Sequence, residues 1–163
     1  MPLRFFSLLT SLVLAGFFAM HPTVQVNAQA TAQATATVSD AVTPVPRDGN
    51  WLKRHEAMNE RVKQGNVDLV FIGDSITQGW EGSGKEVWKK FYGERNAVNL
   101  GISGDRTQHV IWRLDHGNLE GISPKVAVIM IGTNNSGSNS PEEIAEGVTK
   151  IVEQIREKTP KTK

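Results

Sequence analysis

A serine, a glycine and an asparagine follow three apolar segments of the sequence, each in a short loop of glycine and small polar residues. The loops contain, in chain order, Gly73-Asp74-Ser75, Ser103-Gly104 and Gly132-Thr133-Asn134. A serine hydroxyl in a tight turn between a strand and a helix is suited to act as a nucleophile. Gly104 lets a backbone N–H approach a substrate closely, and Asn134 offers a side-chain NH₂ donor. With the N–H of Ser75, these groups predict a three-donor oxyanion hole, the apparatus of acyl transfer.

Each of these residues also has a purely structural interpretation. Ser75 could cap a helix, Gly104 could be a turn glycine and Asn134 could form an Asx-turn. Their occurrence after three successive strands favours the catalytic interpretation. Asp74 could either bond to neighbouring loop amides and stiffen the turn or tune Ser75, and we favour the first role.

The apolar segments cover residues 67–72, 97–102 and 126–131, and amphipathic patterns alternate with them. We expect helices over residues 51–64, over 85–92, from Asp105 with Gln108 as its capping-box partner, and from Pro141 with Ser140 as N-cap. This alternation predicts an α/β fold with a parallel sheet covered on both faces. The three loops then meet at the carboxyl ends of the strands, where such sheets bind ligands.

Three stretches, GDSITQ, NLGISGDRTQHVIWRL and VAVIMIGTNN, resemble blocks I, II and III of the SGNH (GDSL-type) hydrolases. The resemblance is strongest to the branch that holds platelet-activating-factor acetylhydrolase catalytic subunits and secreted bacterial esterases, and it runs from about Trp51 to Pro160. It implies a flavodoxin-like three-layer α/β/α sandwich without metal or cofactor. It also implies that Ser75 is the nucleophile and that Gly104 and Asn134 are oxyanion donors.

The Asp-x-x-His block that supplies the general base in this family has no counterpart in the sequence. We therefore expect a domain truncated after the third strand and its helix, with the strand at residues 126–131 as an exposed edge. None of the four histidines, His21, His55, His109 and His116, is favoured as a substitute base. The chain alone is predicted to be inactive.

The N-terminus has the layout of a secretory signal peptide, predicted over residues 1–30. An apolar run covers residues 5–20, and Ala28-Gln29-Ala30 offers a small-x-small cleavage pattern. An uncleaved anchor is the alternative. Residues 31–50 are predicted to be a flexible linker and residues 51–163 the hydrolase domain. The expected location is secreted or periplasmic, with no membrane span after cleavage. Because the chain has no cysteine, disulfides are excluded.

A net charge of +1 gives no electrostatic reason to expect a nucleic-acid partner. The sequence thus predicts an exported serine esterase acting on short-chain or acetyl esters of glycans or lipids. The alternatives are a non-catalytic fragment that binds a ligand or partner, and a fragment without a stable fold. Oligomerisation is left open. A near-match to a phosphate-binding loop at residues 79–85 fails because Glu86 stands where Ser or Thr must hold Mg²⁺.

Overall fold

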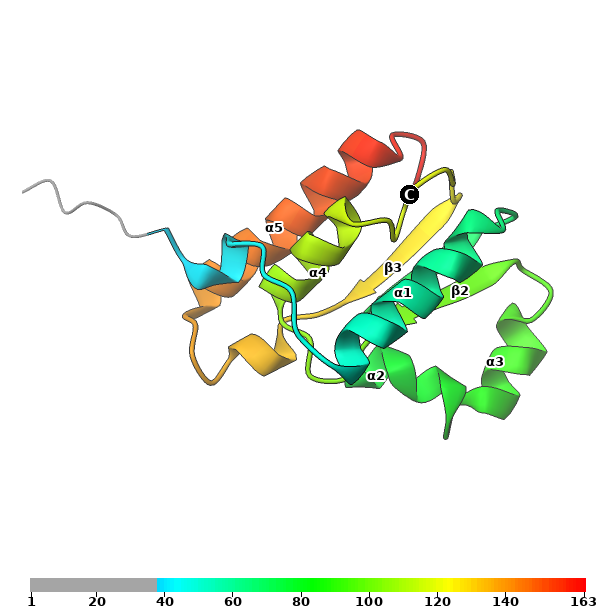
Figure 1. Cartoon of the computed structure of the whole chain (residues 1–163), viewed down its shortest axis with the longest axis horizontal. Helices are drawn as coiled ribbons and strands as arrows, with labels where there is room; N and C mark the ends of the chain where they lie inside the picture. The colour runs from blue at the N-terminus through cyan, green and yellow to red at the C-terminus, as the bar shows by residue number, and fades with distance from the viewer. Residues whose placement is uncertain (1–37) are drawn as a thin grey trace, which may run out of the picture. The chain divides into compact units, whose positions relative to one another are not determined.

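The computed structural model describes residues 38–163, which form a parallel three-stranded sheet flanked by helices (Figure 1). The strands are β1 (Leu69–Gly73), β2 (Ala97–Gly101) and β3 (Val126–Met130), in the order β2-β1-β3. Gly73, the last residue of β1, is level with Gly101 of β2 and Met130 of β3. The three carboxyl ends therefore lie at one edge of the sheet, and the predicted α/β fold is confirmed.

Five α-helices and three 3₁₀ turns accompany the strands in this part of the chain. The helices are α1 (Asn50–Lys63), α2 (Ser75–Gln78), α3 (Lys85–Tyr92), α4 (Thr107–Asp115) and α5 (Pro141–Lys158). The turns are η1 (Asp40–Val42), η2 (Gly79–Glu81) and η3 (Thr133–Asn135). None of the helices within residues 38–163 has the length and apolar character that crossing a bilayer requires. The predicted signal peptide at residues 1–30 lies outside the described residues.

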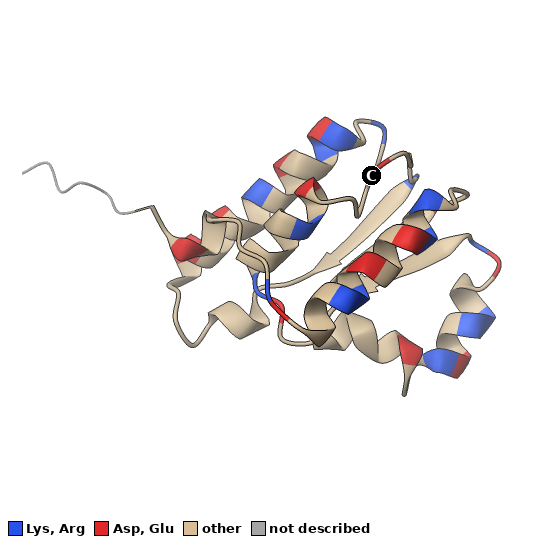
Figure 2. Cartoon of the chain, in the orientation of Figure 1, with Lys and Arg blue, Asp and Glu red and all other residues tan. Residues whose placement is uncertain are grey.

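One face of the sheet carries the hydrophobic core. Alternation along β1 and β2 turns Val70, Ile72, Val98 and Leu100 to this face, where they are buried. Apolar residues of α1, α4 and α5 complete the core: Met58, Val62, Val110, Ile111, Leu114, Ile151 and Ile155. Figure 2 shows that Lys, Arg, Asp and Glu lie on helices and loops and that the strands carry none. The strands thus bind the helices mainly by burial of apolar side chains. Hydrogen bonds add to this, such as those from Arg54 Nε to the Gly101 carbonyl (2.9 Å) and from Asn99 Nδ2 to the Thr77 carbonyl (2.9 Å).

The opposite face of the sheet is only partly covered, which differs from the expected coverage of both faces. An aromatic cluster protects the middle of β1, because the Phe71 ring lies 4.9 Å from Trp88 and 5.0 Å from Tyr92 of α3 between centroids. Nothing in residues 38–163 covers β3 in the same way, and Val128 and Met130 on this face are 40% and 46% exposed. The apolar sequence of β3 predicts that both of its faces are buried, but it does not show which helix would cover each face.

The outer edge of β3 was predicted to be exposed, and the structure shows that it is partly paired. The Ala127 N–H donates to the carbonyl of Lys163 (2.8 Å), and the Lys163 N–H donates to the carbonyl of Lys125 (3.0 Å). This is the hydrogen-bond pattern of a parallel strand pair, and it satisfies the edge at one position.

Residues 38–50 do not form the expected flexible linker. Within this segment, η1 packs against α4 and α5, and Ala41 is fully buried. The Thr107 hydroxyl donates to the Ala41 carbonyl (2.7 Å). Gly147 of α5 allows this approach, because a Cβ there would lie 2.9 Å from the same carbonyl. The linker prediction is therefore wrong for residues 38–50, and residues 31–37 lie outside the described residues.

Helix starts were predicted correctly for α5 and incorrectly for α4. The predicted capping box of α5 is present, with the Ser140 hydroxyl accepting from the Glu143 N–H (3.2 Å). Helix α4 begins at Thr107 rather than at Asp105, and His109 Nδ1 accepts from the Arg106 N–H (2.9 Å). Asp105 does not cap the helix because its carboxylate is bound by the side chains of Trp51 and Arg113.

Candidate active site

The loop after β1 holds Ser75 at the edge of the sheet. Ser75 is the first residue of α2 and is exposed. Asp74 precedes it as a buried N-cap whose Oδ1 accepts from the Ile76 N–H (2.9 Å). The structural role that the sequence favoured for Asp74, bonding a loop amide and stiffening the turn, is therefore present.

Two glycines at the strand ends let α2 pack directly onto the sheet. A Cβ on Gly73 would lie 2.2 Å from Thr77 Oγ1 and 2.4 Å from the Met130 carbonyl oxygen. A Cβ on Gly101 would lie 2.4 Å from the Gln78 nitrogen. Only glycine fits at either position without displacement of the backbone. These two glycines therefore determine how closely α2, which begins with Ser75, approaches the ends of the strands.

The loop after β2 presents Gly104. Its φ of +78° is a conformation that favours glycine. The preceding Ser103 N–H donates to Gln78 Oε1 (2.7 Å), which ties this loop to α2. Among the residues that the structure describes, neither the Gly104 N–H nor the Ser75 N–H has a hydrogen-bond partner. Both amides are thus available to an incoming oxygen.

The loop after β3 joins the other two loops through Asn134. Gly132 (φ +112°) turns the chain, and the exposed Thr133 opens η3. The Asn134 side-chain nitrogen donates to the Asp105 carbonyl (2.8 Å) and lies 3.4 Å from Asp74 Oδ2. The side chain of Asn134 therefore lies between the residue before Ser75 and the residue after Gly104, as convergence of the three loops requires.

The orientation of Asn134 differs in one respect from that of a free oxyanion donor. One N–H is firmly held by the Asp105 carbonyl, whereas the contact with Asp74 is long for a hydrogen bond. The weakly held N–H is the one directed towards the Ser75 loop.

A neighbouring asparagine, which the sequence did not single out, fixes this loop. Asn135 is fully buried, and its Oδ1 accepts from the Thr107 N–H at the start of α4 (2.9 Å). Its Nδ2 donates to Gln108 Oε1 (3.0 Å) and to Asn139 Oδ1 (2.9 Å). Asn135 therefore anchors the loop that carries Asn134, and two adjacent asparagines after an apolar strand were the available signal.

A buried ion pair contacts both the end of β1 and the loop after β2. Arg113 and Asp105 are both fully buried, and Arg113 Nε donates to Asp105 Oδ2 (2.9 Å). Arg113 Nη2 lies 3.4 Å from the Gly73 carbonyl, and Nη1 donates to Asn118 Oδ1. Trp51 Nε1 donates to Asp105 Oδ1 (2.6 Å). The sequence signal was a charged residue on the buried face of a helix, where a charge requires a partner.

No histidine within residues 38–163 hydrogen-bonds to Ser75. His55 stacks on Trp51 (5.8 Å between ring centroids), and burial, with the charge of Arg113, lowers its pKa to about 4. Burial, with the charges of nearby arginines, also lowers the pKa of His109 to about 4. His116 is the C-cap of α4, with Nδ1 2.6 Å from the Trp112 carbonyl oxygen. The described residues thus place no imidazole on the candidate nucleophile.

An open depression of about 440 Å³ lies beside Ser75. Its lining includes Ser75, Gln78, Glu81 and Ser103. Among the described residues, no group of three or more His, Cys, Asp or Glu side chains is arranged to hold a metal ion. The groups at this edge that suit acyl transfer are the Ser75 hydroxyl, the two free amides and the Asn134 carboxamide.

Comparison with known proteins identifies relatives of this chain. Residues 71–163 match the GDSL-like lipase/acylhydrolase family. The chain is 38% identical over 122 residues to the platelet-activating factor acetylhydrolase IB subunit alpha1 of Bos taurus, covering 75% of this chain and 51% of that protein. It is 38% identical over 128 residues to the alpha2 subunit of Homo sapiens, covering 78% of this chain and 55% of that protein.

A solved structure shares the fold. The GDSL-like lipase of Bacteroides thetaiotaomicron superposes with a TM-score of 0.52 at 26% identity, covering 68% of this chain and 54% of that one. The chain thus spans about half the length of the curated relatives it matches. The resemblance noted in the sequence is confirmed: the chain belongs to the GDSL-like lipase/acylhydrolase family.

Proposed function

We propose that this chain carries the nucleophile and oxyanion hole of a serine ester hydrolase. Ser75 Oγ attacks the ester carbonyl carbon and gives its proton to water or an added base, and the carbonyl oxygen becomes an oxyanion beside the amides of Ser75 and Gly104 and the carboxamide of Asn134. The oxyanion then collapses, the C–O bond to the alcohol breaks and the alcohol leaves with a proton. Water hydrolyses the resulting acyl-enzyme to the free acid and regenerates Ser75. One observation carries the proposal: the Asn134 nitrogen lies within 3.4 Å of Asp74 Oδ2 and 2.8 Å of the Asp105 oxygen. These atoms belong to the immediate neighbours of Ser75 and Gly104.

The residues described here favour slow turnover. A serine hydroxyl is a weak nucleophile until a base accepts its proton. No imidazole is hydrogen-bonded to Ser75 in residues 38–163. Only the acceleration from binding and the oxyanion hole is then available.

The proposed substrates are short-chain or acetyl esters of glycans or lipids, and the proposed location is outside the cytoplasm. The relatives named as acetylhydrolases support the acyl group. The N-terminal apolar run and the Ala28-Gln29-Ala30 pattern support export. Mass spectrometry of exported protein tests the location, with Thr31 as the expected new N-terminus; an intact Met1 in that fraction would reject cleavage.

Addition of imidazole as an external base tests the catalytic proposal. Nitrophenyl acetate hydrolysis is measured over a range of imidazole concentrations for the wild type, Ser75→Ala and Ser103→Ala. Because imidazole itself hydrolyses the ester, the quantity of interest is the rate difference between each protein and Ser75→Ala. We expect this difference to be small without imidazole and to rise with its concentration. Ser103→Ala, a serine in the same depression, should behave as the wild type.

Equal rates for wild type and Ser75→Ala at every imidazole concentration would exclude Ser75 as the nucleophile. Rapid hydrolysis without imidazole that Ser75→Ala abolishes would retain the nucleophile and reject the expectation of slow turnover. The first result rejects Ser75 as the nucleophile, and the second rejects only the expectation of slow turnover.

A further inference from the structure

The segment before α1 brings a cationic side chain onto the Gly104 loop. Arg47 Nη1 donates to the Ser103 carbonyl (2.9 Å) and lies 3.3 Å from Asp105 Oδ1. A Cβ built on Gly104 would lie 3.2 Å from Nη1 and 3.3 Å from Nη2 of Arg47. The guanidinium thus lies against Gly104, whose amide has no hydrogen-bond partner among the described residues.

The charge of Arg47 is not cancelled by its carboxylate partner. Asp105 is already paired with Arg113, which is closer and fully buried. Two guanidinium groups therefore share one carboxylate. The other charged groups near this edge include Asp74, on the Ser75 side, and the half-buried Arg106, whose Nη1 donates to Ser138 Oγ (3.0 Å). Glu81 also lines the depression and is paired with Arg54 (2.8 Å), and His109 Nδ1 lies 3.8 Å from Asp105 Oδ1. The carboxylate of Asp74 repels a negative charge that forms beside Ser75. The positive charge of Arg47 counteracts this repulsion.

Part of the Arg47 guanidinium remains free to meet a ligand. The side chain is 37% exposed. Its Nη1 is anchored, whereas Nη2 and Nε have no hydrogen-bond partner among the residues that the structure describes. An anchored guanidinium with unused donors meets a developing charge with little reorganisation.

We infer that Arg47 is a further catalytic residue, which contacts the oxyanion beside the Gly104 amide and adds a full positive charge to the oxyanion hole. This inference rests on the proposed function, because it places Arg47 against the oxygen that the Ser75 reaction would generate. It also gives a role to the segment that carries Arg47, in which η1 packs against α4 and α5.

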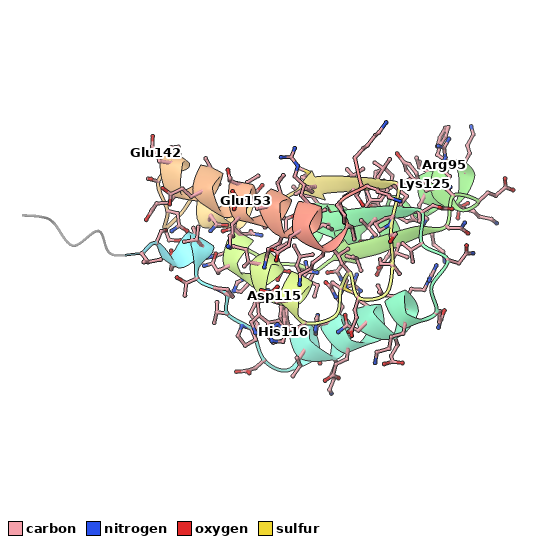
Figure 3. The ribbon with its side chains drawn as sticks, turned by 90° about the horizontal axis from the view of Figure 1, so that it is seen from above. Arg95, Asp115, His116, Lys125, Glu142 and Glu153 are labelled. Atoms are coloured by element: carbon pink, nitrogen blue, oxygen red, sulfur yellow. The ribbon has the colours of Figure 1, made fainter. Side chains whose placement is uncertain are left out.

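Anion binding followed by amide NMR tests the inference without requiring turnover. The 163-residue chain is titrated with methylphosphonate, a tetrahedral anion, and with ethyl acetate as an uncharged probe, while the Ser75 and Gly104 amide signals are monitored. The variants are Arg47→Gln, Arg47→Lys and the control Arg95→Gln. Arg95 lies with Lys125 at the amino ends of the strands, away from the candidate site (Figure 3).

We expect methylphosphonate to shift both amides and Arg47→Gln to weaken its binding about fivefold or more, the size of one charge contact at a partly exposed site. Arg47→Lys should retain most of the affinity because it keeps the charge, and Arg95→Gln should bind as the wild type. Ethyl acetate should shift the Ser75 and Gly104 amide signals to the same extent in all four proteins.

Binding by Arg47→Gln within twofold of the wild type would overturn the role of Arg47. A loss in Arg47→Lys as large as that in Arg47→Gln would also overturn it, because charge would then not be the cause. If methylphosphonate shifts neither amide of the wild type, the oxyanion hole and with it the proposed function fail, which is a distinguishable result.

Discussion

Replacement of Arg113 by methionine should destabilise the domain strongly. Arg113 is fully buried and donates to Asp105 Oδ2 at 2.9 Å, and it also contacts the Gly73 carbonyl and Asn118. Methionine fills much of the same volume but supplies no donor. The substitution therefore leaves the buried Asp105 carboxylate with the Trp51 indole and the more distant Arg47 only.

The magnitude follows from the cost of a buried, unpaired charge. Removal of one partner of a buried ion pair costs about 3–5 kcal/mol of unfolding free energy. Arg47, at 3.3 Å and 37% exposed, compensates in part, so the lower end of that range is expected. The exposed Arg156 of α5 provides the control, since Arg156→Met should change the stability by no more than about 0.5 kcal/mol.

The deficit should also depend on pH, with a sign set by Asp105. Burial raises the pKa of the Asp105 carboxyl, and the charge of Arg113 and the Trp51 hydrogen bond oppose this rise. Without Arg113 the pKa in the folded state rises further above the unfolded value of about 3.9. Between those two values the folded variant holds a proton that the unfolded chain has lost, so its unfolding free energy falls as pH rises.

Urea unfolding at pH 7.5 and pH 5, followed by tryptophan fluorescence and circular dichroism, measures both effects. The deficit of Arg113→Met relative to the wild type should be about 3 kcal/mol at pH 7.5 and smaller at pH 5. A deficit below about 1 kcal/mol, or one that is larger at pH 5, would refute the view that Arg113 neutralises a buried carboxylate.

Two further outcomes are expected from the glycine at the end of β1 and from the buried histidines. Gly73→Ala should lower the unfolding free energy by about 2–4 kcal/mol in urea unfolding, because its Cβ would lie 2.4 Å from a backbone carbonyl oxygen of β3. The control Gly137→Ala, whose Cβ would have no atom within 4 Å, should be nearly neutral. Similar unfolding midpoints for the two variants would contradict the close packing of α2. In NMR titrations His55 and His109 should both titrate near pH 4. Since the unfolded imidazoles bind protons near pH 6.5, the unfolding free energy should fall as pH decreases from about 6.5 towards 4, and titration of either histidine near 6.5 would reject its burial as a neutral group.

Much of the candidate site could be predicted from local sequence. Apolar runs followed by glycine and a small polar residue placed Ser75, Gly104 and Asn134 after three strands, and the parallel pairing brings those strand ends level. The start of α4 was mispredicted because Asp105 has the residue type of an N-cap. Its carboxylate instead binds Trp51 and Arg113, and that competition between partners is not visible in a local pattern.

The sequence by itself determined the strand-and-helix order, the glycines at the strand ends and the family, because these depend on residue spacing over a few turns. Tertiary structure alone decided that η1 packs against α4 and α5 and that Arg47 reaches Asp105 across 58 positions of the chain. It also decided that β3 has one poorly covered face. The physical reason is that local pattern limits what each segment can become, whereas contacts between distant segments depend on which surfaces the assembled core brings together.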